Sequence, residues 1–287
     1  MAHTAMGVRD LSPEFGAEIT GIDLRGPLSA ELSRQLREVF DERGLLVFRD
    51  VDLQLEVQNR LTYLLMGKPE AADEAFAERA GKLSLVSNRA DGGIAPWGRL
   101  LWHSDSMWSA TPFEVISLWG QAVEQPSVPT SFASGVRAWD TLPDELRARV
   151  AGLHVAQISG QVDRGRYSEG EVLEVTRQHD VTTITPIEFI HPRTGRTILY
   201  VGEQNTLEVV ELAADEGEAL LVELFDHLYD PAHTVEHHWR EGDLVVWDNL
   251  AIQHGRPDVS IEGPARTLRK TFAPHVVSEN PQYGRMS

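Results

Sequence analysis

The sequence predicts a mainly β protein with flanking helices, built on a double-stranded β-helix, or jelly-roll, core. Three observations support this fold class. Beyond residue 83 the chain contains many short runs rich in β-branched and aromatic residues. Turn sequences separate these runs, for example Asp91-Gly92-Gly93 and the segment 192–195. Helical patterns are few among them, and many short strands with few helices favour a double-sheet jelly roll.

The N-terminal part is expected to mix strands with helices. We predict a strand over 16–24 and a helix over 29–43 that is closed by a glycine. A second strand is expected at 45–48, followed by a second helix over 57–67 that also ends on a glycine. Residues 70–82 are alanine-rich, acidic and weakly patterned. They indicate a mobile cover or a surface helix.

The rest of the chain supplies the predicted sheets. Two helices interrupt the strands, one over 143–150 opened by Thr141 and one over 215–228 with an apolar side. No linker composition divides the chain, so 1–287 is predicted to be a single domain, with active-site loops near 68–82 and 160–180. The turn at 192–195 is predicted to join two strands into a hairpin. The expected strands cover 83–86, 102–108, 114–121, 154–158, 182–190, 197–201, 243–247 and 266–272.

Composition narrows the classes of function and partner. The chain has 26 basic and 44 acidic residues, a formal net charge of −18, which opposes binding to nucleic acid or to an anionic membrane surface. A small-molecule partner is therefore expected. Cysteine is absent, so any metal site must use His, Asp and Glu. The N-terminal segment has no signal pattern and no apolar run could span a bilayer, so a soluble, cytoplasmic protein is predicted.

The most informative pattern is Trp102-His103-Ser104-Asp105, followed far downstream by His254. In an extended segment alternate side chains share a face, so His103 and Asp105 could bind one ion while His254 supplies the third ligand. Two imidazoles and one carboxylate leave part of the coordination sphere open, as in the facial triad of non-haem Fe(II) oxygenases. An isolated His-x-Asp is more often a hydrogen-bonded surface pair.

Aromatic residues around this motif favour the metal site over a surface pair. Trp97, Trp102, Met107 and Trp108 surround two ionisable groups, and an unpaired charge in such surroundings would be costly. A metal ion would offset that cost.

Other histidines and two basic residues near the C-terminus are further candidates for the site. His191, beside a turn, is predicted to be structural. His237 and His238 are adjacent and would point to opposite faces of an extended segment, so one or both are expected to be solvated. On the strand that begins at Arg266, Arg266 and Lys270 should face the same side. A guanidinium there suits capture of a carboxylate, and solvated edge charges are the alternative.

Taken together, these fragments resemble the taurine dioxygenase family of Fe(II)- and 2-oxoglutarate-dependent oxygenases. The resemblance runs from residues 16–24 through the His103 motif to Trp247-Asp248-Asn249, His254 and Arg266. It implies that His103, Asp105 and His254 ligate the iron. It also implies that Arg266 and Thr130 bind 2-oxoglutarate, although the family's usual Gly-Gly-Asp before this threonine is here Ser127-Val128-Pro129.

The resemblance implies an enzyme that uses Fe(II), 2-oxoglutarate and O2, releases succinate and CO2, and oxidises a small organic molecule, most often by hydroxylation. Lys270 takes the place of the arginine that holds the sulfonate in the taurine enzyme, so an anionic substrate is one expectation. Asn88, Trp97 and Trp102 are the other expected substrate contacts. Relatives commonly associate, so a homo-oligomer is expected. A zinc-type hydrolase or isomerase, or a non-catalytic binding protein on the same fold, are the alternatives.

Overall fold

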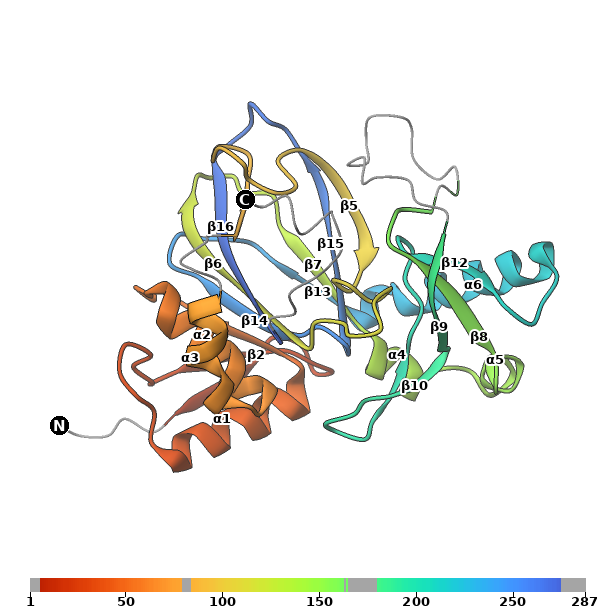
Figure 1. Cartoon of the computed structure of the whole chain (residues 1–287), viewed down its shortest axis with the longest axis horizontal. Coiled ribbons are helices and arrows are strands. Elements are labelled where there is room, and N and C mark those ends of the chain that lie inside the picture. Colours follow the sequence, from red (N-terminus) through yellow and green to blue (C-terminus); the bar gives the residue numbers. More distant parts are fainter. Residues whose placement is uncertain (1–5, 79–83, 163, 165–179, 275–287) are drawn as a thin grey trace.

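Two β-sheets lie face to face in the computed structural model, which describes residues 6–78, 84–162, 164 and 180–274 (Figure 1). The larger sheet has seven strands in the order β1-β2-β3-β14-β6-β16-β4 and the smaller has four in the order β13-β7-β15-β5. This double-sheet arrangement is the predicted jelly-roll core. The larger sheet comprises β1 Gly7–Asp10, β2 Ala17–Thr20, β3 Leu45–Phe48, β14 Leu244–Asp248, β6 Val115–Val123, β16 Arg266–Ala273 and β4 Ser84–Ser87. The smaller sheet comprises β13 Thr234–His237, β7 Thr130–Ser134, β15 Ile252–Val259 and β5 Gly98–His103.

The central strands of the larger sheet are buried on both faces, and β3 shows why. Leu45 and Val47 pack in the cluster between the two sheets, whereas Leu46 and Phe48 pack in a second cluster on the outer face. Alternation of side chains along a strand produces this division. The uninterrupted apolar sequence of β3 is therefore the signature of a strand covered on both sides.

Helices near the N-terminus cover the outer face of the larger sheet. α1 (Ala30–Arg43) and α2 (Leu55–Met66) contribute to the same cluster as the outward side chains of β3. Both helices were predicted, and each ends at a glycine with positive φ. Downstream, η1 (Pro69–Ala71) and α3 (Ala72–Glu78) pack against α2. The remainder of the predicted cover, 79–82, lies outside the described residues.

The chain between β7 and β13 forms a separate layer beside the smaller sheet (Figure 1). It contains a three-stranded sheet in the order β12-β8-β9 and the predicted hairpin, β10-β11. Most of the predicted loop 160–180 lies outside the described residues. The elements of this layer are α4 Gly135–Asp140, α5 Asp144–Val150, β8 His154–Ile158, β9 Val181–Pro186, β10 Glu188–Ile190, β11 Thr197–Leu199, β12 Thr206–Val209, α6 Ala214–Leu228 and η2 Pro231–His233.

Two local predictions in this layer were wrong. The single strand expected over 182–190 is divided at Ile187, so that β9 pairs with β8 and β10 pairs with β11. Thr141 does not open α5 but closes α4, where its hydroxyl donates to Arg137 O at 2.9 Å. The six-residue helix α4 has too little periodicity to be recognised in the sequence, so its C-terminal threonine was assigned to the next helix.

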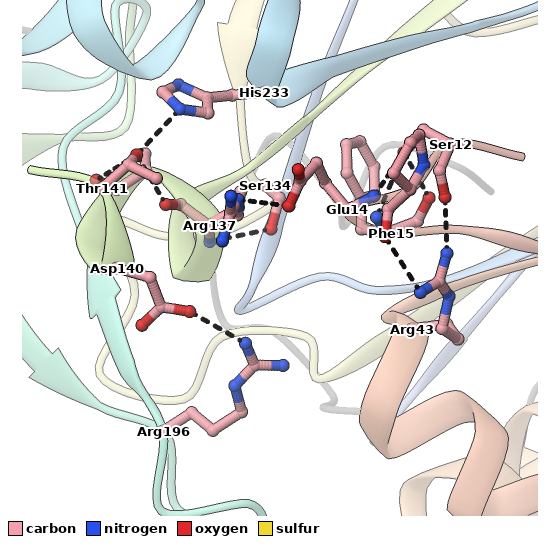
Figure 2. A network of polar contacts seen from close by, with 12 residues as sticks. Ser12, Glu14, Phe15, Arg43, Ser134, Arg137, Asp140, Thr141, Arg196 and His233 are labelled. Carbon is pink, nitrogen blue, oxygen red and sulfur yellow. Dashed lines mark hydrogen bonds and ion pairs between the residues drawn. The ribbon is translucent and has the colours of Figure 1, made fainter. Parts of the chain in front are cut away.

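An ion pair joins this layer to the N-terminal segment, and further polar contacts lie within each of the two parts (Figure 2). Arg137 of α4 lies 2.5 Å from a carboxylate oxygen of Glu14, and Arg196 lies 3.2 Å from Asp140. Arg43, at the end of α1, donates to Ser12 O at 2.6 Å. The ion pair between Arg137 and Glu14 thus connects α4, which follows β7 directly, to the N-terminal segment. Among the described residues, no helix has the length and apolar character needed to cross a membrane.

Candidate metal centre

His103, Asp105 and His254 converge at one end of the smaller sheet. Each offers one ligand atom, and these atoms all lie within 4.8 Å of one another. The antiparallel pairing of β5 with β15 sets His254 directly opposite His103, with ring centroids 4.2 Å apart. Across the described residues, this is the one cluster of His, Asp or Glu side chains with the geometry to hold a metal ion. The structure thus brings together the three side chains that the sequence predicted as ligands.

The local structure fixes which atoms meet at this centre. His103 is the last residue of β5, and its Nδ1 lies 2.7 Å from Leu101 O, which directs Nε2 toward Asp105. Asp105 lies in a turn rather than in the strand, because β5 ends at His103 and Met107 N donates to Ser104 O at 3.2 Å. Alternation along a single extended segment is therefore not what places Asp105 beside His103.

Asn249 holds the turn that carries Asp105. Its Oδ1 accepts from Asp105 N at 3.0 Å, and its Nδ2 donates to Asp105 O at 2.9 Å and to Phe113 O at 2.8 Å. Asn249 is fully buried and follows β14 directly. One side chain thus satisfies both backbone groups of Asp105, which fixes the carboxylate relative to the two imidazoles.

Replacing Asn249 with alanine should therefore weaken metal binding as well as the fold. Loss of three buried hydrogen bonds should lower the free energy of unfolding by about 3 kcal/mol, and loosening the Asp105 turn should weaken Mn(II) binding about tenfold or more. Calorimetric titration and denaturant unfolding would measure both. Asn205→Ala is a matched control, because Asn205 is also buried but holds Ile158 O and Gly160 O instead. It should lower stability alone, and equal Mn(II) affinity in the two variants would contradict the role of Asn249.

Electrostatics keep the centre in the form that a metal ion requires. Burial, together with nearby His103, lowers the pKa of His254 well below its ordinary value, so this ring is neutral and can donate a lone pair. Burial by itself raises the pKa of Asp105, but the positive charge of Lys270 and contacts with His103 and His254 outweigh it and hold this pKa well below the usual range. Two imidazoles and one ionised carboxylate match the donor set that non-haem Fe(II) sites use.

A second polar group lies on β16 and β7. Arg266 is buried, and its Nη2 donates to Thr130 Oγ1 at 2.9 Å while its Nε donates to Val128 O at 3.3 Å. Trp239 Nε1 also donates to Thr130 Oγ1, at 2.9 Å. Because Thr130 Oγ1 accepts twice, the hydroxyl proton is left to donate to another acceptor. The pair predicted to bind 2-oxoglutarate is thus in direct contact.

Arg266 is a buried cation with no carboxylate within ion-pair distance in the described part of the chain. Burial, with additional repulsion from Arg256, lowers the pKa of its guanidinium. An isolated buried charge is costly, and an anion beside Arg266 would stabilise its charged form. Arg266 and Thr130 together therefore have the chemistry of a carboxylate-binding site.

The two faces of β16 separate these groups from the outer core. Arg266, Leu268 and Lys270 point inward, where Leu268 joins the cluster between the sheets. Arg269 points outward and donates to Gln58 Oε1 of α2 at 2.8 Å. This confirms the predicted division of the strand. Lys270 Nζ lies 2.6 Å from Asp105 Oδ2, so β16 reaches the metal centre as well as the Arg266 site.

The structure does not bring Asn88 to the centre as a substrate contact. Its Nδ2 donates to Ser260 O and to Pro264 O, both at 3.0 Å, and its Oδ1 accepts from Arg266 N at 2.9 Å. These bonds use both amide hydrogens and one lone pair of the amide oxygen. Asn88 therefore holds the loop that leads into β16. It also binds the backbone N–H of Arg266, on the main chain rather than at the guanidinium.

Trp102 points away from the converging side chains. Trp102 stacks on Tyr229 with ring centroids 4.8 Å apart, on the opposite side of β5 from His103. Trp97 precedes β5 and is 36% exposed. The aromatic rings that contact His254 are instead Trp247, at 4.9 Å, and Phe132, at 6.4 Å between centroids. Their positions follow from pairing between distant strands, which the sequence neighbours of His103 do not reveal.

Arg256 is a site residue that the sequence interpretation missed. It is buried on β15, two residues after His254, and its charge adds to the effect of burial in lowering the pKa of Arg266. Its Nη2 donates to Ala95 O at 2.7 Å and to Trp97 O at 3.1 Å, which holds the segment before β5. The period of two along a strand was the available signal.

The remaining histidines have separate roles. His191 is buried and its Nε2 lies 2.9 Å from Asp248 Oδ2, which confirms the prediction that it is structural. His237 is buried too, 3.2 Å from Asp243, whereas the side chain of His238 is 71% exposed. Of these two, only His238 is solvated.

Comparisons with known proteins agree with this geometry. Residues 7–272 match the family model described as Taurine catabolism dioxygenase TauD, TfdA family. An alpha-ketoglutarate-dependent 2,4-dichlorophenoxyacetate dioxygenase of Cupriavidus pinatubonensis is 28% identical over 276 residues, which are 91% of this chain and 94% of that protein. The (S)-phenoxypropionate/alpha-ketoglutarate-dioxygenase of Sphingobium herbicidovorans is 29% identical over 259 residues, 87% of this chain and 88% of that one.

Solved structures give the same result. A taurine dioxygenase from Burkholderia xenovorans superimposes with a TM-score of 0.73 and 25% identity, covering 93% of this chain and 90% of that chain. AAD-2 in complex with Mn(II) and N-oxalylglycine superimposes with a TM-score of 0.72 and 27% identity, covering 93% of this chain and 96% of that chain. By its sequence and fold, the chain belongs to the TauD/TfdA dioxygenase family.

Proposed function

We propose that this protein is an Fe(II)- and 2-oxoglutarate-dependent dioxygenase that hydroxylates a small organic anion and releases succinate and CO2. The main support is the Arg266–Thr130 pair, a buried carboxylate-binding arrangement on the same inner surface as the three metal-binding side chains. Relatives are named as alpha-ketoglutarate-dependent dioxygenases, and the similar AAD-2 structure contains Mn(II) together with N-oxalylglycine.

Each side chain has a distinct task in this reaction. His103, Asp105 and His254 would hold the iron and leave one side of it open. When bound, iron with 2-oxoglutarate supplies the oxidation, in which O2 is consumed, the keto acid is decarboxylated to succinate and a substrate C–H bond is hydroxylated. Arg266 and Thr130 would hold the far carboxylate of 2-oxoglutarate by charge-assisted hydrogen bonds and so orient the keto acid. The apolar rings of Trp247 and Phe132 exclude water from one side of His254.

Charge favours an anionic substrate. The inward-facing cations Arg266 and Lys270 outnumber the one carboxylate of the centre, Asp105. 2-Oxoglutarate and the metal ion carry opposite charges and largely offset each other, so positive charge remains for a second anion. Relatives are named for phenoxyacetate, phenoxypropionate and sulfonate substrates, all of them organic anions.

Two measurements test this function. Anaerobic addition of Fe(II) and 2-oxoglutarate should produce a visible charge-transfer band, which neither addition produces alone. Succinate formation should then be screened over aryloxy acids, sulfonates, alkyl sulfates and amino acids, and at least one anion should increase it in step with O2 consumption. A hydrolase on the same fold would act without O2 and without Arg266. Absence of the band in protein loaded with metal would refute the proposal.

The proposed setting of the reaction is the cytoplasm, because the reaction requires reduced iron and a keto acid of central metabolism.

Association into a homo-oligomer stays a prediction. Light scattering of the purified protein would test it.

A further inference from the structure

Lys270 contacts the carboxylate that would bind the metal. Its Nζ lies 2.6 Å from Asp105 Oδ2, while Asp105 Oδ1 lies 3.6 Å from His103 Nε2. Both side chains of the ion pair are largely buried, with 11% and 13% of their surfaces exposed. Solvent therefore screens this pair weakly. The ammonium contacts one oxygen of Asp105, the single acidic ligand that the described residues supply to the centre.

A metal ion at this centre would meet the Lys270 ammonium at close range. Both are cations drawn to the same carboxylate, so their mutual repulsion weakens the binding of either one. Lysine is suited to such an exchange, because its ammonium is a compact charge on a flexible stem with rotatable donors. Arg266, on the same face of β16, is by contrast fixed to Thr130 and Val128.

We propose that Lys270 is a positioning residue that acts as the counter-cation of Asp105 in the metal-free centre and competes with the metal for it. The inference rests on the proposed function only in taking His103, Asp105 and His254 as metal ligands. In the metal-free protein the ammonium neutralises a buried carboxylate and keeps it in place. The same contact lowers metal affinity. Lys270 thereby sets the concentration of Fe(II) at which the centre fills, a role different from the substrate contact that the sequence predicted.

Mn(II) titration of purified, metal-free protein tests this role. The concentration of free Mn(II) is measured by electron paramagnetic resonance. Lys270→Met removes the charge and keeps the length, and it should lower the Kd for Mn(II) about tenfold or more, because a charge within about 4–6 Å alters the proton affinity of a carboxylate about 10–1000-fold. Lys270→Arg keeps the charge and should stay within about threefold of the wild type. A residue that only supports the structure would weaken Mn(II) binding in both variants.

Thermal unfolding supplies the second readout. Metal-free Lys270→Met should have a lower Tm than the wild type, because Asp105 loses its counter-cation, and saturating Mn(II) should remove most of that difference. Arg269→Met is the matched control: it deletes the adjacent cation on the opposite face of β16, and should lower Tm without changing the Kd for Mn(II). If Lys270→Met does not fold without metal, Lys270→Gln is titrated in its place.

The outcomes separate this inference from the proposed function. Tighter Mn(II) binding in Lys270→Met, with the Arg variant unchanged, supports the competition even if no substrate is found. An unchanged or raised Kd in the folded Met or Gln variant overturns it, while a normal Fe(II) and 2-oxoglutarate band would leave the proposed function standing. Failure of the wild type to bind Mn(II) would overturn both.

Discussion

Replacing His254 with alanine is expected to lower substrate-dependent succinate formation at least ~1000-fold, since losing a group that merely supports a metal ligand already costs about 10–100-fold. His254 is buried, neutral and paired across strands with His103, so no described histidine or carboxylate can take its place within the 4.8 Å cluster. The same variant should show no visible band with Fe(II) and 2-oxoglutarate. Succinate formation and the absorbance of the visible band are measured for the variant and the wild type at equal protein concentrations.

His238→Ala is the control for this substitution. It also removes an imidazole, but from an exposed position beside Glu236, so activity and Tm should match the wild type. The circular dichroism and Tm of His254→Ala must stay close to those of the wild type for the loss of activity to be assigned to the metal. Full turnover by a folded His254→Ala protein would remove His254 from the proposed ligand set.

The parts of the site that could be predicted from the sequence are those determined by residue type and order. His103, Asp105 and His254 are distinguished by their donor atoms. The paired strands β5 and β15 bring the two histidines together, and the turn held by Asn249 adds Asp105. Thr130 contacts Arg266 although the residues before this threonine differ from the family pattern. The reason is that Val128 contacts Arg266 through its main-chain carbonyl, which any side chain at that position would supply.

Other parts depend on contacts between distant segments. Asn88 was expected to contact the substrate, but its hydrogen bonds reach Ser260 and Pro264 in another loop. Trp102 lies beside a metal-binding histidine in sequence, yet alternation along β5 turns it toward Tyr229. The β-propensity of 182–190 predicts extended backbone correctly, but it does not reveal that the segment changes partners at Ile187. Local patterns thus identify element types and donor atoms, whereas strand pairing decides which side chains meet.

Replacing Arg266 with methionine should raise the KM for 2-oxoglutarate about 100-fold, because truncating one partner of a buried charge pair costs about 2–5 kcal/mol. Methionine has a similar volume, so no large cavity forms beside Trp239 and Thr130. The Kd for Mn(II) should stay within about threefold of the wild type, because Arg266 contacts none of the three ligands in the described structure. Thr130→Val removes one hydroxyl from the same site and should raise KM by about tenfold. The KM for 2-oxoglutarate is measured from succinate formation, and the Kd for Mn(II) is measured by titration without 2-oxoglutarate. Both values are compared between each variant and the wild type.

Stability distinguishes a binding role for Arg266 from a structural one. In the protein without 2-oxoglutarate, Arg266 is a buried guanidinium that no described carboxylate neutralises, and burial lowers its pKa. Replacing such a charge with an apolar side chain of similar size is often neutral or stabilising. The Tm of Arg266→Met without ligand should therefore equal or exceed that of the wild type, while addition of 2-oxoglutarate with Mn(II) should raise the Tm of the wild type far more than that of the variant. A lower Tm with equal losses of 2-oxoglutarate and Mn(II) binding would show that Arg266 supports the fold and does not recognise the keto acid.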